Sequence, residues 1–175
     1  GGYSKKLLQF SETKVIGIDR DPNVTSIADK LVTKYHNRFK FYQSKFSQID
    51  RILKDNVDTI IFDLGLSSIQ LNNFKRGFSF KSKEKLDMTM GLSDISAQDV
   101  VNNCSELELK LIIKILGEEK EAKTIAQNII KARSKKKITR VNELVDIIEK
   151  SKKKTFSKIN PSTKTFQALR IFVNK

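Results

Sequence analysis

The stretch that most constrains this chain is residues 57–71, VDTIIFDLGLSSIQL. It opens with the apolar run Thr59–Phe62, which is rich in β-branched and aromatic residues and short enough for a buried parallel strand. Asp63 follows at once, and then a loop of small residues with one glycine and two serines. In open α/β sheets, ligands bind just beyond the carboxyl ends of the strands. The stretch therefore predicts a strand with a binding site at its carboxyl end.

The residues before this stretch alternate between helical and strand patterns. Strand patterns cover residues 14–18 and 39–43, and helical patterns cover residues 4–10, about 22–36 and 46–53. Asp21 can cap the second of these helices, and Pro22 suits its first position. Such alternation predicts a parallel sheet with crossover helices.

The second half of the chain has helical patterns from Ser96 onward. They cover residues 97–103, 105–115, 118–133, 139–150 and 161–173. Ser105 and Glu108 have the spacing of a capping box, and Gly117 suits the end of that helix. Residues 69–92 lack a period but contain several phenylalanines and methionines, so they predict an ordered, functional loop.

The charge of the chain is strongly positive and unevenly distributed. The net charge is +14, and residues 110–158 hold 15 Lys and Arg against 6 Asp and Glu. This asymmetry favours a partner that carries phosphates. The alternative is a solvated lysine-rich surface that binds nothing in particular.

Other features narrow the class of protein. Cys104 is the only cysteine and His36 the only histidine, which argues against a disulfide, a zinc site and a Ser-His-Asp triad. No apolar run approaches the ~20 residues of a membrane span, and the first residues have no signal-peptide pattern. We expect a cytoplasmic protein without metal and without a membrane partner.

Three residues in the first half are candidates for nucleotide contacts. Asp19 ends the first predicted strand, where an acidic residue can accept hydrogen bonds from ribose hydroxyls. The carboxylate of Asp63 could accept from an exocyclic amine of a cofactor or a substrate base. Phe46 could stack on an adenine. The alternatives are a surface turn for Asp19, a helix cap for Asp63 and a core position for Phe46.

The irregular segment has the composition of a base-stacking loop. Arg76 stands among Phe74, Phe78 and Phe80, and aromatic rings with Arg are typical of single-stranded RNA contacts. The alternative is a small core under the loop.

Several motifs together resemble a known family. GGYS, GIDRDP, FDLGLSS-x-QL, RGFSF, LDM, GEE and TFQALRI-x-VN occur in this order. The set resembles the bacterial small-subunit (16S) rRNA cytosine-N4 methyltransferases of the MraW/RsmH type, over essentially the whole chain. The resemblance implies an α/β fold: a partial class I (Rossmann-like) methyltransferase parallel sheet with an inserted all-helical domain. It also implies that the family's first strand would precede Gly1 and its last strands would follow Lys175.

The resemblance implies an organisation and a set of site residues. The core would be residues 1–92, a basic helical insert for RNA recognition residues 93–158, and a helix returning to the core residues 159–175. The cofactor S-adenosylmethionine would be bound by Gly1, Gly2, Tyr3, Asp19, Phe46, Asp63 and Gln70. Small-subunit rRNA would be contacted by Arg76, Phe78, Phe80, Lys135, Lys136 and Lys137.

The implied reaction transfers a methyl group to the N4 amine of a cytidine in the small (30S) ribosomal subunit. Asp63 is the candidate to accept a hydrogen bond from that amine. Two alternatives remain at this point: an RNA-binding remnant without catalysis, and a class I methyltransferase that acts on another substrate.

Overall fold

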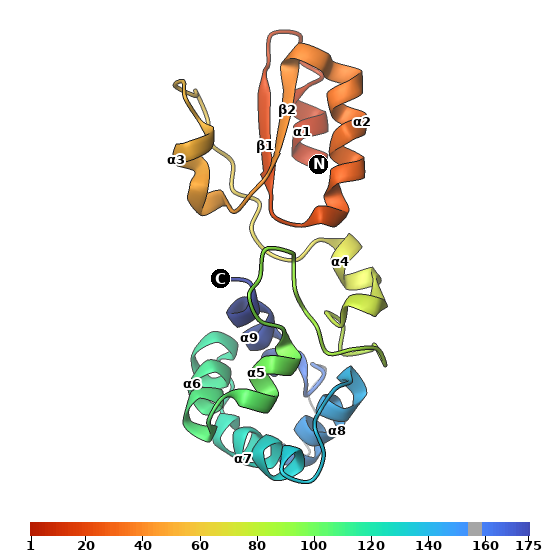
Figure 1. The fold of residues 1–175 in the computed structure, drawn as a ribbon, viewed down its shortest axis with the longest axis vertical. Helices are drawn as coiled ribbons and strands as arrows, with labels where there is room; N and C mark the ends of the chain where they lie inside the picture. The colour runs from red at the N-terminus through yellow and green to blue at the C-terminus, as the bar shows by residue number, and fades with distance from the viewer. Residues whose placement is uncertain (154–158) are drawn as a thin grey trace. The chain divides into compact units, whose positions relative to one another are not determined.

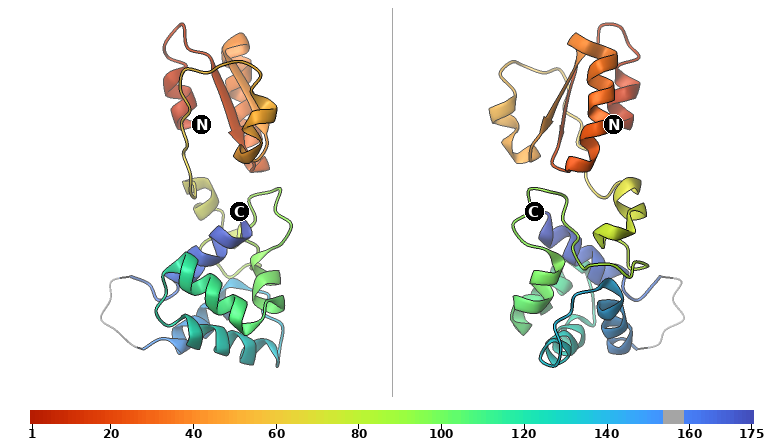
Figure 2. Two further views of the ribbon diagram at one scale, coloured as in Figure 1. Left: turned by 90° about the vertical axis from the view of Figure 1, so that its left-hand side faces the viewer. Right: turned by 45° about the vertical axis from the view of Figure 1, so that its right-hand side comes forward.

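A computed structural model describes residues 1–153 and 159–175, and in this range the side chains of Ser68 and Ile69 are not described. The chain divides into two compact units. Unit 1 comprises residues 1–63 and 90–92, and unit 2 comprises residues 64–89 and 93–175. Figures 1 and 2 show the elements of each unit. The predicted end of the helical insert, residue 158, lies outside the described residues.

Unit 1 contains short helices and a small sheet. In chain order its elements are α1 (Gly2–Leu7), β1 (Val15–Asp19), the 3₁₀ helix Pro22–Val24, α2 (Thr25–Tyr35), the 3₁₀ helix His36–Arg38, β2 (Phe39–Gln43), the 3₁₀ helix Phe46–Gln48 and α3 (Ile49–Ile52). The strands β1 and β2 are parallel, with Val15 opposite Phe39 and Asp19 opposite Gln43. Both predicted strands, and the crossover helix between them, are confirmed.

The core of unit 1 is small. Its buried members are Leu8, Ala28, Leu31 and Phe39. Ile27 and Val32, which helical periodicity predicts on the core face of α2, are 39% and 37% exposed. Only two side chains of α2 are buried, because the sheet has only two strands. The apolar face of the helix is wider than the sheet surface against which it packs.

The prediction of a third strand is wrong. Residues Thr59–Phe62 form no strand, and Ile60, Ile61 and Phe62 are 52%, 50% and 57% exposed. A strand needs hydrogen bonds to a neighbour. Among the described residues no strand pairs with this segment, so it stays unpaired and exposed. The chain is thus a mixed α/β protein with a two-stranded parallel sheet and many helices.

Unit 2 is helical. Its elements are α4 (Ser68–Asn72), the 3₁₀ helix Phe74–Arg76, α5 (Ala97–Asn103), α6 (Glu106–Gly117), α7 (Ala122–Arg133), α8 (Val141–Ser151) and α9 (Thr163–Val173). The capping boxes at the starts of α5 and α6 are both formed, by Ser96 with Asp99 and by Ser105 with Glu108. None of the described helices combines the length and hydropathy that crossing a membrane requires.

The end of α6 differs from the prediction for a physical reason. The left-handed residue is Glu118 (φ 51°), and Gly117 is the last helical residue. A Cβ atom on Gly117 would lie 2.4 Å from the carbonyl oxygen of Lys164 and 3.2 Å from the Cβ of Ala168. Gly117 is therefore required because α6 and α9 approach closely at this position. It is not required for a left-handed backbone conformation, since that conformation is adopted by Glu118.

Replacing Gly117 with Ala should destabilise the protein. In an open helix this change stabilises by about 0.5–1 kcal/mol. At Gly117 the added methyl group must push a backbone carbonyl away, so we expect a loss of about 1–3 kcal/mol in the free energy of unfolding. Urea unfolding followed by circular dichroism measures it. Gly2→Ala is the control, because its Cβ would meet nothing within 4 Å. A stabilised Gly117→Ala protein would contradict the proposed contact.

Candidate functional site

The carboxyl end of β1 holds an exposed carboxylate in a defined turn. The Asp21 N–H donates to Oδ1 of Asp19 (2.8 Å), and the Ser44 N–H donates to the Asp19 carbonyl oxygen (3.1 Å). Oδ2 of Asp19 has no partner among the described residues. The carboxylate is therefore fixed at one oxygen and can accept a hydrogen bond at the other.

The turn after Asp19 is held from two sides. Oδ1 of the buried Asp21 accepts from the Asn23 backbone N–H (3.0 Å), which starts the following 3₁₀ helix. Arg20 donates from Nε to the Gly91 carbonyl (3.0 Å) and from Nη2 to the Leu92 carbonyl (2.8 Å). The sequence analysis missed Arg20, because its partners lie about 70 residues away in the chain.

Phe46 and Asp63 lie within unit 1 as well. Phe46 is 55% exposed, and its ring meets the ring of Phe62 edge to face at 5.9 Å. Since Phe62 directly precedes Asp63, this contact keeps the Asp63 segment near the residues that follow β2. Asp63 itself is exposed.

The remaining predicted cofactor residues lie at the start of α1 and in unit 2. Gly1 and Gly2 start α1, Tyr3 is 58% exposed, and the space around Gly2 is open. Gln70 belongs to unit 2, where it is buried in α4 and its Oε1 accepts from the Ser67 N–H (2.9 Å). Unit 1 thus contains six of the seven predicted cofactor residues, and their role stays a prediction.

The RGFSF segment is packed into unit 2. The Phe78 side chain is fully buried. The carbonyl oxygen of Phe78 accepts hydrogen bonds from Nε (2.9 Å) and from Nη2 of Arg170. The guanidinium of Arg76 lies 5.1 Å from the centre of the Phe78 ring. The half-buried Phe80 meets Phe166 edge to face. No part of the Phe78 ring is free to stack on a base here, which supports the alternative of a small core under the loop.

A glycine is required where this segment turns. Gly77 has φ 70°, and a Cβ atom on it would lie 2.4 Å from the Lys85 carbonyl oxygen. The Met88 N–H donates to the Arg76 carbonyl (2.9 Å), and Arg76 donates to the Thr89 carbonyl (2.7 Å). The segment therefore folds back on itself with a fixed backbone.

The predicted basic turn Lys135, Lys136 and Lys137 is exposed and precedes α8. Nζ of Lys136 lies 2.8 Å from Oε1 of Glu143. Oε2 of Glu143 accepts from the backbone N–H groups of Thr139 (2.9 Å) and Arg140 (3.0 Å). The bond from Lys136, and then the one from the Thr139 N–H, lower the pKa of Glu143 to about 2.

The sequence analysis missed Glu143. It fills the third position of α8 in a capping box, but an Arg precedes it where the usual pattern has Ser or Thr. In the described ranges, no three or more His, Cys, Asp or Glu side chains are grouped so as to hold a metal ion.

Comparison with known proteins assigns the family. The sequence profile described as MraW methylase family matches residues 1–175. The chain belongs to the MraW methylase family.

Curated relatives agree with this assignment. The "Ribosomal RNA small subunit methyltransferase H" of Maricaulis maris is 44% identical over 99% of this chain and 53% of its own length. The proteins of that name from Afipia carboxidovorans and Orientia tsutsugamushi are 42% and 44% identical, over 54% and 58% of their lengths. The chain spans about half the length of the curated relatives that it matches.

Glu143 should make part of the stability depend on pH. Its pKa falls from 4.5 to about 2 on folding, so its contribution is present above pH 4.5 and is lost between pH 4.5 and 2. We expect Glu143→Gln to lower the urea midpoint at pH 7 and the difference from wild type to shrink as the pH falls to 2. Glu149→Gln, an exposed change on the same helix, is the control. A difference that is constant from pH 7 to 2 would contradict this role.

Proposed function

We propose that this chain is part of an S-adenosylmethionine-dependent methyltransferase that acts on the N4 amine of a cytidine in small-subunit rRNA. The observation that carries the proposal is the match to the MraW methylase family over the whole chain. The names of the relatives give the rRNA substrate. The cytidine N4 position comes from the motif resemblance alone.

The residues of unit 1 suit the proposed methyl donor. The available oxygen of Asp19 can accept a hydrogen bond from a ribose hydroxyl. The exposed ring of Phe46 can stack on an adenine. Gly1, Gly2 and Tyr3 lie at the start of α1, where a Cβ atom on Gly2 would meet nothing within 4 Å. A cofactor contact of Gln70 stays a prediction. S-adenosylmethionine, when bound, supplies an electrophilic methyl group.

The protein must orient a weak nucleophile. The lone pair of the cytosine amine is delocalised into the ring, so the reaction requires nitrogen and methyl held in line and a hydrogen-bond acceptor for the amine N–H. We assign the acceptor role to the exposed carboxylate of Asp63. The target base must leave its stack to reach such a site.

We propose that the chain has the three functional regions that the motif resemblance implies. Residues 1–92 would form the catalytic core, residues 93–158 would recognise RNA, and residues 159–175 would return to the core. Lys135–Lys137, Arg76 and Phe80 would contact the small ribosomal subunit in the cytoplasm. Phe78 would support these contacts from the core of unit 2, because its side chain is buried.

Asp19→Asn should weaken binding of the methyl donor. The Asn side chain keeps one oxygen to accept from the Asp21 N–H. It replaces the second, charged oxygen, which would accept from the ribose hydroxyl, with an NH2 group that can only donate. Because hydrogen bonds to charged groups contribute about 1.5–3 kcal/mol, we expect a ten- to hundredfold loss of affinity. Calorimetric titration of S-adenosylmethionine into the protein measures it. Asp29→Asn, an exposed change on α2, is the control, and equal affinities for the two variants would refute the role of Asp19.

Transfer to RNA tests the substrate. Mass mapping of small-subunit rRNA from a strain that lacks the gene should show the loss of one N4-methyl group on a cytidine. Full retention of that group would remove the rRNA assignment and leave a methyltransferase of another substrate. A protein that binds small-subunit rRNA but gives no heat with S-adenosylmethionine would be an RNA-binding remnant.

A further inference from the structure

Two distant segments of unit 2 are joined through their backbones. Residues 84–86 and 139–141 run antiparallel, with a bridge between Lys85 and Arg140. The Leu86 N–H donates to the Thr139 carbonyl (2.9 Å), and the Val141 N–H donates to the Glu84 carbonyl (3.0 Å). The lysine-rich part of the irregular segment therefore lies directly beside the basic turn that precedes α8.

Helix α5 holds both segments in this arrangement. The Gln98 N–H donates to the Leu86 carbonyl (2.7 Å), and the side chain of Asn102 bonds both backbone groups of Ile138 (2.7 and 3.0 Å). Leu86 and Ile138 are themselves buried. Since each segment is anchored by side-chain burial and by backbone hydrogen bonds, their relative position is fixed within unit 2.

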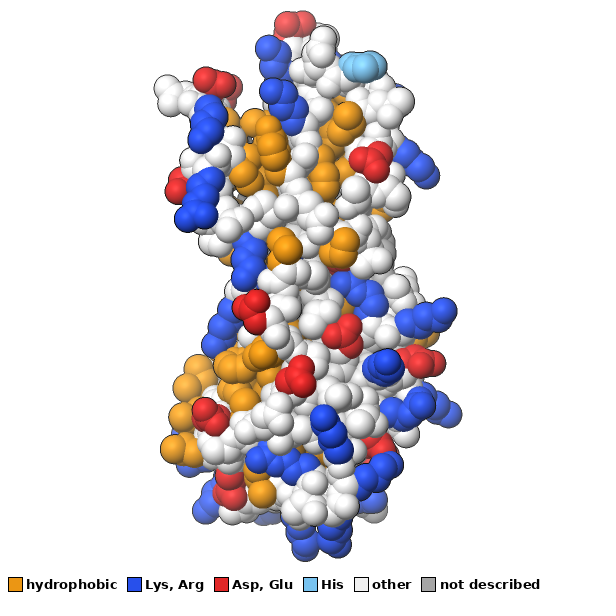
Figure 3. Space-filling model, in the orientation of Figure 1, with side chains coloured by type: hydrophobic (Ala, Val, Ile, Leu, Met, Phe, Trp, Pro, Cys, Tyr) orange, Lys and Arg blue, Asp and Glu red, His pale blue; other side chains and the backbone are white. Residues whose placement is uncertain are grey.

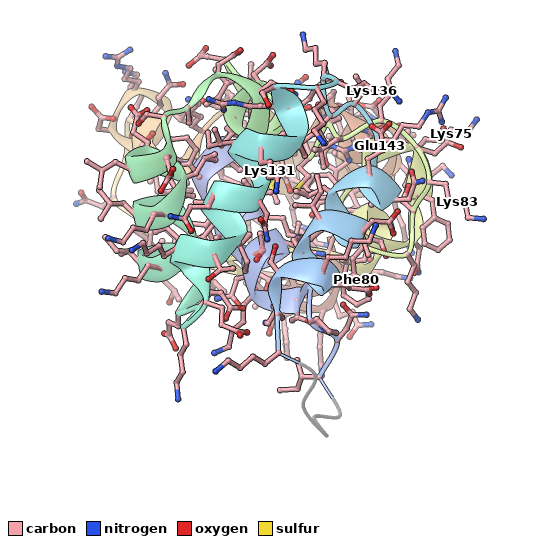
Figure 4. All side chains as sticks on the ribbon, turned by 90° about the horizontal axis from the view of Figure 1, so that it is seen from below. Lys75, Phe80, Lys83, Lys131, Lys136 and Glu143 are labelled. Carbon is pink, nitrogen blue, oxygen red and sulfur yellow. The ribbon has the colours of Figure 1, made fainter. Side chains whose placement is uncertain are left out.

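The joined segments carry many cations and few available anions. Residues 75–85 contain four exposed lysines, and the turn contributes three lysines and an arginine, all exposed: Lys75, Lys81, Lys83, Lys85, Lys135, Lys136, Lys137 and Arg140. Figure 4 shows Lys75 and Lys83 on the same side as Lys136 and Glu143. Figure 3 shows many Lys and Arg side chains, with Asp and Glu side chains between them, on the face of unit 2 that it presents. Among the described residues, Lys75, Lys81, Lys83, Lys85 and Lys135 pair with no carboxylate.

The nearby carboxylates are occupied by local structure. Asp99 accepts from Ser96 in the cap of α5, and Glu143 bonds Lys136 and the start of α8. Asp87 accepts from the Thr89 hydroxyl (3.2 Å). Glu84 is the one acidic residue within the two segments. Glu84 and Glu143 therefore offset only part of the charge of the eight cations, and the two segments together remain positively charged.

We infer that these eight residues form one phosphate-binding surface for RNA, which we call the two-segment basic surface. The choice of RNA rests on the proposed function. The surface extends that proposal, because the lysines at 75–85 and Arg140 join the three lysines of the turn. It also gives the RGFSF segment a role that agrees with the burial of Phe78: the segment, anchored by Phe78, positions the lysines on either side of it toward the RNA backbone.

Paired charge removals test whether the two segments act together. The first variant is Lys75→Gln with Lys83→Gln, the second is Lys135→Gln with Lys137→Gln, and the third combines all four changes. The control is Lys30→Gln with Lys54→Gln, two exposed lysines of unit 1. Binding of a fluorescent small-subunit rRNA transcript to the protein is measured by anisotropy from 50 to 200 mM salt.

We expect each two-lysine variant to lose about three- to tenfold in affinity at 100 mM salt. The slope of log affinity against log salt should fall by about 1.5 in magnitude for each pair and by about 3 for all four, because each phosphate contact contributes about 0.7–0.9. The control should change less than twofold. If either pair matches the control, the two segments do not form one RNA surface.

Two further measurements separate this inference from the proposed function. Affinity for S-adenosylmethionine and the unfolding temperature should be unchanged in every variant; a fall in either would show that the lost RNA affinity reflects unfolding, and would overturn the inference. If the protein transfers no methyl group while the RNA results hold, the proposed function fails and the surface stands. If vesicles with 30% phosphatidylserine displace the transcript from the wild type and not from the four-lysine variant, the surface binds membranes and the inference is wrong.

Discussion

Backbone hydrogen bonds from residues 84–87 to α5 and to residues 139–141 are the constraint on which unit 2 depends. They turn a segment without regular secondary structure into a fixed part of a helical unit. Gly77 permits the segment to fold back, and Arg170 from α9 bonds the Phe78 carbonyl. A long loop in a compact protein needs such partners, because its backbone groups must be satisfied without a helix or a sheet.

Unit 1 depends on the parallel pairing of β1 with β2. That pairing sets the carboxyl ends of both strands at one edge, and the turn that follows β1 presents one oxygen of Asp19 for an outside donor. In our proposal the two units have different roles: unit 1 offers a carboxylate at a strand end to a nucleoside, and unit 2 offers a surface of lysines to phosphates.

Local patterns predicted most elements but not the pairing between distant ones. The strands 15–19 and 39–43 and the capped helices α5 and α6 were predictable, because alternation, caps and periodicity act within a few residues. The strand predicted at Thr59–Phe62 is absent from the structure, because strand formation needs a neighbouring strand and the local pattern does not show whether one is present. The place of Asp19 at the end of β1 was predictable from the strand pattern, and its role stays a prediction. The buried Phe78, the partners of Arg20 and the Lys85–Arg140 bridge depend on contacts across the fold.

Cross-linking of bound RNA tests the central claim of this account, that the irregular segment and the basic turn carry the RNA contacts. Photo-cross-linking of thiouridine-labelled small-subunit rRNA to the protein, followed by mass spectrometry of the peptides, identifies the residues that touch RNA. We expect cross-links concentrated in residues 75–85 and 135–140. Cross-links confined to the lysines of α6 and the turn after it, with neither segment represented, would contradict it.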